Sequence, residues 1–137
     1  MAGEDVGLWR FDAAPYGATA PIKVGDADGR RLVADAEGMA LAPQSERGGY
    51  VIVSSQGDNA YSAYRLGGDR YVGRFRIVAG RVGAAEETDG IDPVSGDFGP
   101  AFPGGLPVVQ DGVNDLGSQI FKLVARDDVA RALRLEP

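Results

Sequence analysis

Short apolar runs separated by turn-forming residues extend along the whole chain, a pattern typical of β-strands joined by tight turns. Alternation of apolar and polar side chains is clearest over residues 71–78, as expected for a half-buried edge strand. The expected strands are residues 7–12, 21–24, 38–41, 50–54, 60–66, 71–78, 106–109 and 121–124. The pattern therefore predicts an all-β fold of short antiparallel strands.

The C-terminal segment has a different pattern. Residues 127–133 begin with two acids and place apolar side chains at Val129, Ala130 and Leu133, which predicts a short capped helix. Two segments are expected to be irregular: the acidic loop at residues 86–92 and the Gly- and Pro-rich connection at residues 96–105.

A glycine-rich acidic turn recurs along the chain at a nearly constant period. Gly3 and Gly57 lie 54 positions apart, and Gly57 and Gly112 lie 55 apart. A second series runs in step with the first, because Gly38 and Gly90 each follow an acid, lie 52 apart and lead toward a strand. An aromatic residue, a cation and an apolar residue follow each turn of the first series: Trp9-Arg10-Phe11, Tyr64-Arg65-Leu66 and Phe121-Lys122-Leu123. Periods of this size indicate stacked supersecondary units and fit one blade of a β-propeller.

Composition excludes several classes of site and partner. The 137 residues contain neither histidine nor cysteine, so His- and Cys-based zinc sites and His-based triads are excluded, and a metal would have to be held by oxygen. The net charge of −6 argues against a nucleic-acid surface. No apolar run approaches the roughly 20 residues of a membrane span, and the N-terminus lacks the pattern of a signal peptide.

Four short polar segments are candidates for cation binding. They are residues 35–38, 54–59, 86–92 and 109–114. Carboxylate and amide oxygens beside glycines suit a hard cation such as calcium. Taken singly, each segment is more often a solvated turn, since Asp, Asn and Gly form turns by themselves. Their recurrence at corresponding ends of successive strands favours cation binding, because such strand ends converge near the central channel of a propeller.

Considered together, these motifs resemble the C-terminal part of the β-propeller phytases, a family of six-bladed, calcium-dependent phosphohydrolases. The motifs that carry the resemblance lie at residues 6–11, 28–30, 35–38, 50–59, 71–72, 88–92, 110–112 and 121–123. The resemblance implies a partial six-bladed β-propeller of about two to three antiparallel blades with a short C-terminal helix. Residues 1–137 would then be the C-terminal part of a phytase domain and a fragment of a longer chain.

The resemblance also implies a reaction and a set of site residues. Calcium ions would activate a water molecule that attacks a phosphomonoester of phytate in line, without a covalent enzyme intermediate. The implied catalytic residues are Glu4, Glu37 and Asp89, and Arg30 is the candidate for substrate binding. The implied calcium ligands are Glu4, Asp35, Glu37, Gln56, Asp89 and Asn114, with Asp111 a weaker candidate.

The chain departs from the family pattern in places. A further family aspartate falls in a stretch that reads Gly83-Ala84-Ala85 here, and Val113 replaces an acid. The family's phosphate-binding Lys and Arg cluster belongs to earlier blades. The expected cofactor is Ca²⁺, the expected partner is phytate or calcium-phytate, and the expected location is secreted or periplasmic.

Two other functions remain open from the sequence. The chain could be a non-catalytic, calcium-binding propeller segment that acts as a binding or self-assembly module, because open blade edges favour pairing with another copy. A calcium-dependent lactonase or esterase propeller would share the acidic channel but explains fewer of the motifs.

Overall fold

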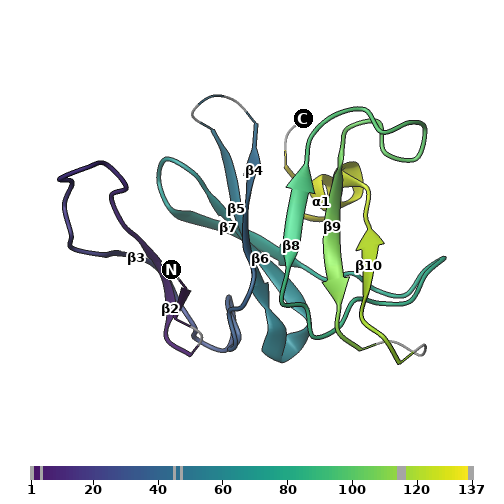
Figure 1. Ribbon diagram of the computed structural model, residues 1–137, viewed down its shortest axis with the longest axis horizontal. Helices are drawn as coiled ribbons and strands as arrows, with labels where there is room; N and C mark the ends of the chain where they lie inside the picture. The colour runs from purple at the N-terminus through teal and green to yellow at the C-terminus, as the bar shows by residue number, and fades with distance from the viewer. Residues whose placement is uncertain (1, 4, 45, 47, 114–116, 136–137) are drawn as a thin grey trace.

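The strands form three antiparallel sheets that stand side by side (Figure 1). The computed structural model describes residues 2–3, 5–44, 46, 48–113 and 117–135. Sheet A comprises β1 (Ala2–Gly3), β2 (Gly7–Arg10) and β3 (Ile22–Asp26). Sheet B comprises β4 (Met39–Pro43), β5 (Gly49–Ser55), β6 (Ala60–Arg65) and β7 (Arg70–Phe75). Sheet C comprises β8 (Ile91–Val94), β9 (Leu106–Asp111) and β10 (Ile120–Leu123). The prediction of an all-β fold with a few propeller-like blades is confirmed.

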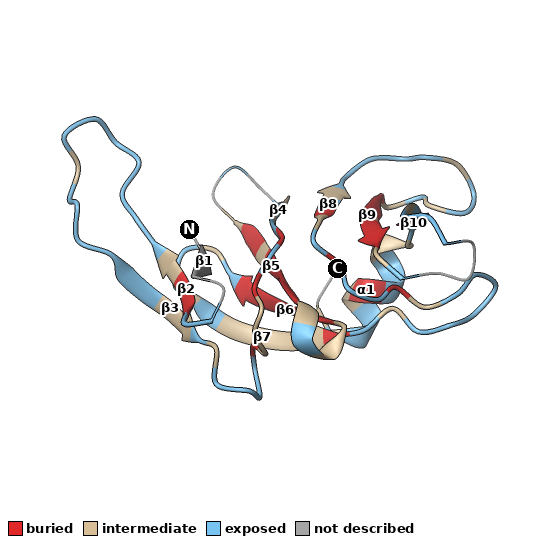
Figure 2. Ribbon diagram, turned by 60° about the horizontal axis from the view of Figure 1, so that its bottom comes forward, coloured by how far each residue is buried: buried red, intermediate tan, exposed pale blue. Residues whose placement is uncertain are grey.

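Sheet B is the middle layer and supplies side chains to two hydrophobic cores (Figure 2). One core, between sheets A and B, contains Leu8, Leu32, Ala36, Val53 and Tyr64. The other, between sheets B and C, contains Ile52, Tyr61, Phe75, Ala85, Ile91, Val109 and Val129. Successive side chains of a strand point to opposite faces of its sheet, so β5 and β6 can serve both cores. Both strands are accordingly buried almost throughout.

The helix α1 (Arg126–Ala132) closes the outer side of the core between sheets B and C. Its Val129 is buried in that core, and Asp127 and Asp128 occupy its first turn, where negative charge stabilises a helix. The predicted helix at residues 127–133 is therefore confirmed, but not its cap, because the N-cap residue is Ala125, which has no side-chain hydrogen-bonding group. Among the described residues, no helix is long and apolar enough to cross a membrane.

Strand β8 corrects the prediction of an acidic loop at residues 86–92, because Ile91 and Asp92 already pair with β9. Pro93 hides this strand from sequence patterns, since proline cannot donate a ladder hydrogen bond. The strand tolerates it because β8 lies at the edge of sheet C. Sequence reasoning also missed the short strand β1. The edge position predicted for residues 71–78 is confirmed by β7, which ends sheet B and is half-buried over most of its length.

Sheets B and C repeat the same arrangement, but one predicted equivalence is wrong. Val53 pairs with Met39 and Ser62 in sheet B, and Val109 pairs with Ile91 and Lys122 in sheet C. Lys122 is therefore equivalent to Ser62, and the triplets at residues 64–66 and 121–123 do not correspond. The error arises because the connection at residues 112–119 is longer than the one at residues 56–59.

Candidate functional site

Two loops from neighbouring sheets meet at the end of the molecule where β5 and β9 finish, the bottom of Figure 1. The first loop is the 3-10 turn η1 (Gln56–Asp58), which directly follows β5. The second contains Asp89 and leads into β8. The side-chain amide of Gln56 donates a hydrogen bond of 2.6 Å to Oδ1 of Asp89. Two predicted site residues that lie 33 positions apart in sequence are thus in direct contact.

Asp35 and Glu37 lie in the segment that enters β4 and borders both of these loops. The backbone N–H of Gln56 donates to the carbonyl oxygen of Asp35 at 2.9 Å. Between the two acids Ala36 is buried, whereas Asp35 is half-buried and Glu37 is exposed. The same alternation recurs at Thr88 and Asp89, which supports the predicted equivalence of Glu37 and Asp89.

Two glycines allow these segments to approach closely. A Cβ atom on Gly38 would lie 2.3 Å from the carbonyl oxygen of Asp89, and a Cβ on Gly57 would lie 1.9 Å from that of Ala34. Any other residue at either position would collide with backbone. Gly38 therefore brings Glu37 toward Asp89, and Gly57 brings η1 toward Asp35.

Matching hydrogen bonds hold the loops that enter β4 and β8. In sheet B, the N–H of Ser54 donates to the carbonyl oxygen of Gly38 at 2.8 Å. In sheet C, the N–H of Gln110 donates to the carbonyl oxygen of Gly90 at 3.0 Å. Side chains add a second bond in each sheet, because the hydroxyl of Ser54 accepts from the Gly38 N–H and Oε1 of Gln110 accepts from the Asp89 N–H, both at 2.7 Å. Glu37 and Asp89 are thus placed by equivalent backbone contacts.

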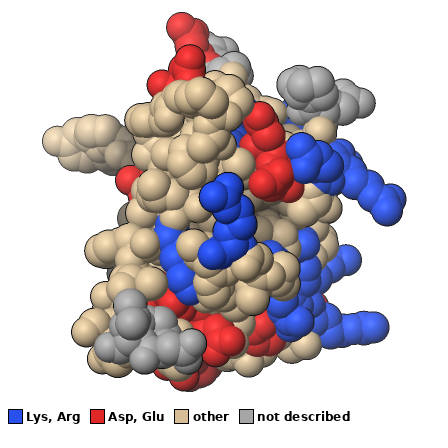
Figure 3. Space-filling model, turned by 90° about the vertical axis from the view of Figure 1, so that its right-hand side faces the viewer, with Lys and Arg blue, Asp and Glu red and all other residues tan. Residues whose placement is uncertain are grey.

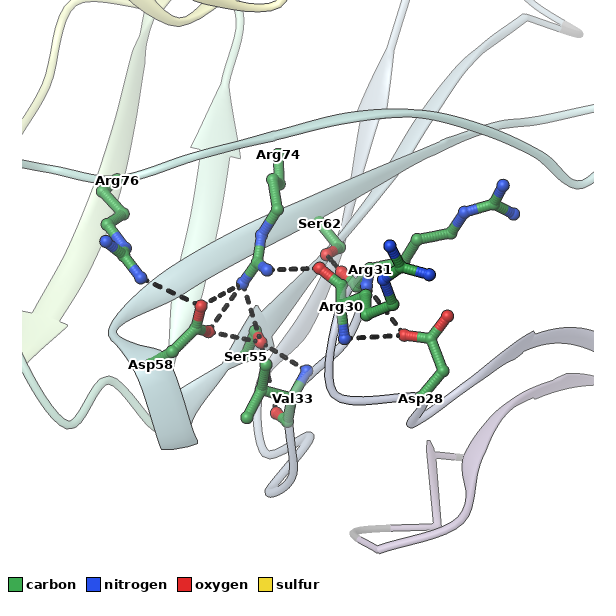
Figure 4. A network of polar contacts seen from close by, with 9 residues as sticks. All are labelled: Asp28, Arg30, Arg31, Val33, Ser55, Asp58, Ser62, Arg74 and Arg76. Atoms are coloured by element: carbon green, nitrogen blue, oxygen red, sulfur yellow. Dashed lines mark hydrogen bonds and ion pairs between the residues drawn. The ribbon is translucent and has the colours of Figure 1, made fainter.

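Asp58 anchors η1 through a network of polar contacts (Figure 4). Its carboxylate accepts hydrogen bonds from Nη2 of Arg74 at 2.6 Å, Nη2 of Arg76 at 3.0 Å and the hydroxyl of Ser55 at 2.9 Å. Partial burial opposes ionisation of Asp58, but the hydrogen bond from Ser55 and the two guanidinium groups outweigh it and lower the pKa of this carboxyl group. Asp58 is therefore charged and holds η1 in place two positions after Gln56. Neither arginine was predicted to take part in the site.

The weaker ligand candidate Asp111 is engaged in a buried ion pair. One of its carboxylate oxygens lies 2.6 Å from Nζ of Lys122, and the other accepts the N–H of Glu86 at 2.9 Å. Burial opposes ionisation, yet these contacts lower the pKa of Asp111. Because its oxygens already bind an ammonium group and a backbone N–H, Asp111 holds the loop before β8 in place.

The remaining predicted site residues are Arg30, Glu4 and Asn114. Arg30 lies on an exposed loop, where its N–H donates to Oδ1 of Asp28 at 2.9 Å and its carbonyl oxygen accepts from Arg74. Glu4 and Asn114 lie outside the described residues. That these two residues lie beside Asp35, Glu37, Gln56 and Asp89 therefore stays a prediction.

The gathered donors suit calcium in kind, because three carboxylates and one amide supply oxygen ligands. Within the described part of the chain, however, no three acidic side chains are arranged so that they could hold a metal ion by themselves. Figure 3 shows acidic side chains at the bottom of the molecule, the end at which these loops meet. The donor chemistry thus fits a hard cation, with further ligands required from elsewhere.

Comparison with known proteins identifies the family. The family model for phytase matches residues 1–137. The chain belongs to the phytase family. It is also 40% identical over 139 residues to the 3-phytase of Bacillus subtilis (strain 168), an alignment that covers 97% of this chain and 36% of that protein. The chain thus spans about a third of the length of this phytase relative.

Membership of the phytase family gives the contact between Gln56 and Asp89 a functional context. Both residues belong to segments on which the sequence resemblance rests.

The ion pair of Asp58 with Arg74 was not predicted, because the two residues lie in different elements and no local sequence pattern links them.

Proposed function

We propose that the complete protein that carries this chain hydrolyses phosphomonoesters of phytate in a calcium-dependent reaction. The phytase family supports phosphate-ester hydrolysis, and the relative named a 3-phytase supports phytate as the substrate. The proposal rests chiefly on the contact of Gln56 with Asp89. This contact brings a candidate ligand from sheet B next to a candidate ligand from the loop that enters sheet C.

Each residue has a distinct part in this proposal. Asp35, Glu37 and Asp89 would each contribute a carboxylate to a calcium-binding site that other parts of the protein complete, and Gln56 fixes the orientation of Asp89 through its 2.6 Å hydrogen bond. Bound calcium would lower the pKa of a coordinated water and attract the polyanionic substrate to an acidic surface. Arg30, exposed at the edge of the same end, is proposed to bind substrate phosphate.

The proposal is tested by measuring phosphate release from phytate by the complete protein, with calcium and after chelation. We expect hydrolysis with calcium, loss of activity on chelation, and recovery when calcium is restored. A lactone and an aryl ester assayed in parallel test the lactonase and esterase alternative. Calcium-dependent cleavage of those compounds, with no release of phosphate from phytate, would overturn the proposal.

A self-assembly module is a second candidate, and the outer face of sheet C favours it. By register, Phe121 of β10 is equivalent to Tyr61 of β6, because they pair with the equivalent residues Gln110 and Ser54. Tyr61 is 1% exposed because sheet C covers it, whereas Phe121 is 74% exposed. A second copy packed on this face would bury Phe121 as sheet C buries Tyr61.

Sedimentation of the 137-residue chain over a range of concentrations tests the second candidate. We expect association that increases with concentration and that Phe121→Ser weakens. The surface substitution Val78→Ser removes another exposed apolar side chain, 73% exposed, and serves as the matched control. A monomer at every concentration would exclude the self-assembly module.

A further inference from the structure

Arg74 contacts both of the segments that carry the candidate site residues of sheet B (Figure 4). Its Nη2 lies 2.6 Å from each carboxylate oxygen of Asp58, at the end of η1. Its Nη1 donates to the carbonyl oxygen of Arg30, at the start of the loop that leads to Asp35 and Glu37. One guanidinium group therefore connects the turn that bears Gln56 with the loop that bears two carboxylates.

Ser55 reinforces this connection from the end of β5. Its hydroxyl donates to Asp58 at 2.9 Å and accepts the N–H of Val33 at 2.8 Å. Asp58, Ser55 and Arg74 thus form one polar cluster between η1 and residues 30–37. The cluster is partly shielded from water, since the side chains of Arg74 and Asp58 are 26% and 21% exposed. Shielding strengthens an ion pair relative to one on the open surface.

Sheet C contains a chemically similar clamp, made by residues at other positions of the sheet. Lys122 of β10 pairs with Asp111 and donates to the carbonyl oxygen of Ala84, while Asp111 accepts the N–H of Glu86. In both sheets, then, a cation on a strand pairs with a carboxylate and also binds a carbonyl oxygen of the incoming loop. That loop carries Glu37 in sheet B and Asp89 in sheet C. The loop that enters the first strand of sheet B and the loop that enters the first strand of sheet C are therefore each held by an ionic clamp.

We propose that Arg74, through its ion pair with Asp58 and its bond to Arg30, is a positioning residue for the calcium site. It holds η1 and residues 30–37 in a fixed relative arrangement, so that Gln56, Asp35 and Glu37 stay at the same end of the molecule, where the calcium site would form. Arg74 would act through Asp58 and Arg30, since a guanidinium group carries positive charge and cannot bind a calcium ion. The inference rests on the proposed function, because it assigns Arg74 a role in forming that same site.

The test is calcium binding by the complete protein, measured by isothermal titration calorimetry together with the kinetics of phytate hydrolysis. We expect Arg74→Met to raise the calcium dissociation constant by about 10-fold or more, the size of effect typical of residues that orient metal ligands. Arg74→Lys should recover much of the affinity, because a lysine keeps the positive charge that pairs with Asp58, as Lys122 pairs with Asp111 in sheet C. Asp58→Asn should weaken calcium binding in the same direction and provides a second variant if Arg74→Met fails to fold.

The matched control is Arg131→Met, which removes an arginine from another Arg–Asp pair. Arg131 lies 2.7 Å from Asp128 on α1, with side chains 76% and 64% exposed, and we expect its loss to leave calcium affinity unchanged. Unchanged affinity in both Arg74→Met and Asp58→Asn would overturn the positioning role while leaving the proposed function intact. An unmodified protein that neither binds calcium nor hydrolyses phytate would overturn both.

Discussion

The side-chain amide of Gln56 donates a 2.6 Å hydrogen bond to the carboxylate of Asp89, and this bond joins sheet B to the loop that enters sheet C. Gln56 follows β5, whereas Asp89 precedes β8. Because each residue is fixed to its own sheet by backbone contacts, the distance between them depends on how closely the two sheets pack. The core around Tyr61 and Val109 therefore also determines the geometry of the candidate site.

Enlarging Gly38 should push the loops of the site apart. A methyl group there would lie 2.3 Å from the carbonyl oxygen of Asp89, so the backbone must shift. We expect Gly38→Ala to destabilise the complete protein by about 1–3 kcal/mol and to weaken calcium binding. Gly68→Ala is the control, because nothing lies within 4 Å of a Cβ at that position. Thermal unfolding and calcium titration measure both effects, and equal behaviour of the two variants would refute the close approach.

Removing Lys122 should destabilise the fold strongly. The side chain of Asp111 is fully buried and its partner ammonium lies 2.6 Å away, so Lys122→Met leaves an unpaired charge in the interior. We expect a loss of about 3–5 kcal/mol in the free energy of unfolding, measured by denaturant titration. The double variant Asp111→Asn/Lys122→Met removes both charges and should recover most of this loss. A double variant less stable than Lys122→Met would contradict the account.

Tyr61 should make stability fall at alkaline pH. Burial raises its pKa to about 12, the hydrogen bond to Thr88 opposes this shift, and the negative charge of Asp111 adds to it. Because the pKa is higher in the folded than in the unfolded state, the stabilisation is complete below about pH 10 and is lost as the pH rises toward 12. As the pH is raised from 8 toward 12, the melting temperature of the unmodified protein should therefore fall more steeply than that of Tyr61→Phe. Parallel curves would show that Tyr61 contributes nothing to this dependence.

The strands most visible in the sequence were those with continuous or alternating apolar side chains. Strands β5, β6 and β9 fall within one or two residues of their predicted bounds, because both faces of these strands are buried. Strand β8 was indicated by the turn at Gly90 but not given bounds, because Pro93 and the acids before it have the composition of a loop. Its strand conformation depends on pairing with β9, a contact with residues well separated from it in sequence.

The candidate site was predicted in part for the same reason. Repetition of acid–glycine turns identified Glu37 and Asp89 as equivalent, and the loops around them make equivalent backbone hydrogen bonds. The role of Arg74 had no local signal, since its partner Asp58 lies 16 residues away on another element. Different turn lengths also shifted the apparent repeat, so Lys122 was matched to Arg65 although the strand register matches it to Ser62.

The most direct test of the proposed calcium-dependent phytase site is phosphate release from phytate by the complete protein and its Asp89→Asn variant over the same series of calcium concentrations. Asparagine keeps the size of the side chain and removes the charge that would bind calcium. We expect the variant to need at least about 10-fold more calcium for half of its maximal activity. Identical calcium dependence of the two proteins would contradict it.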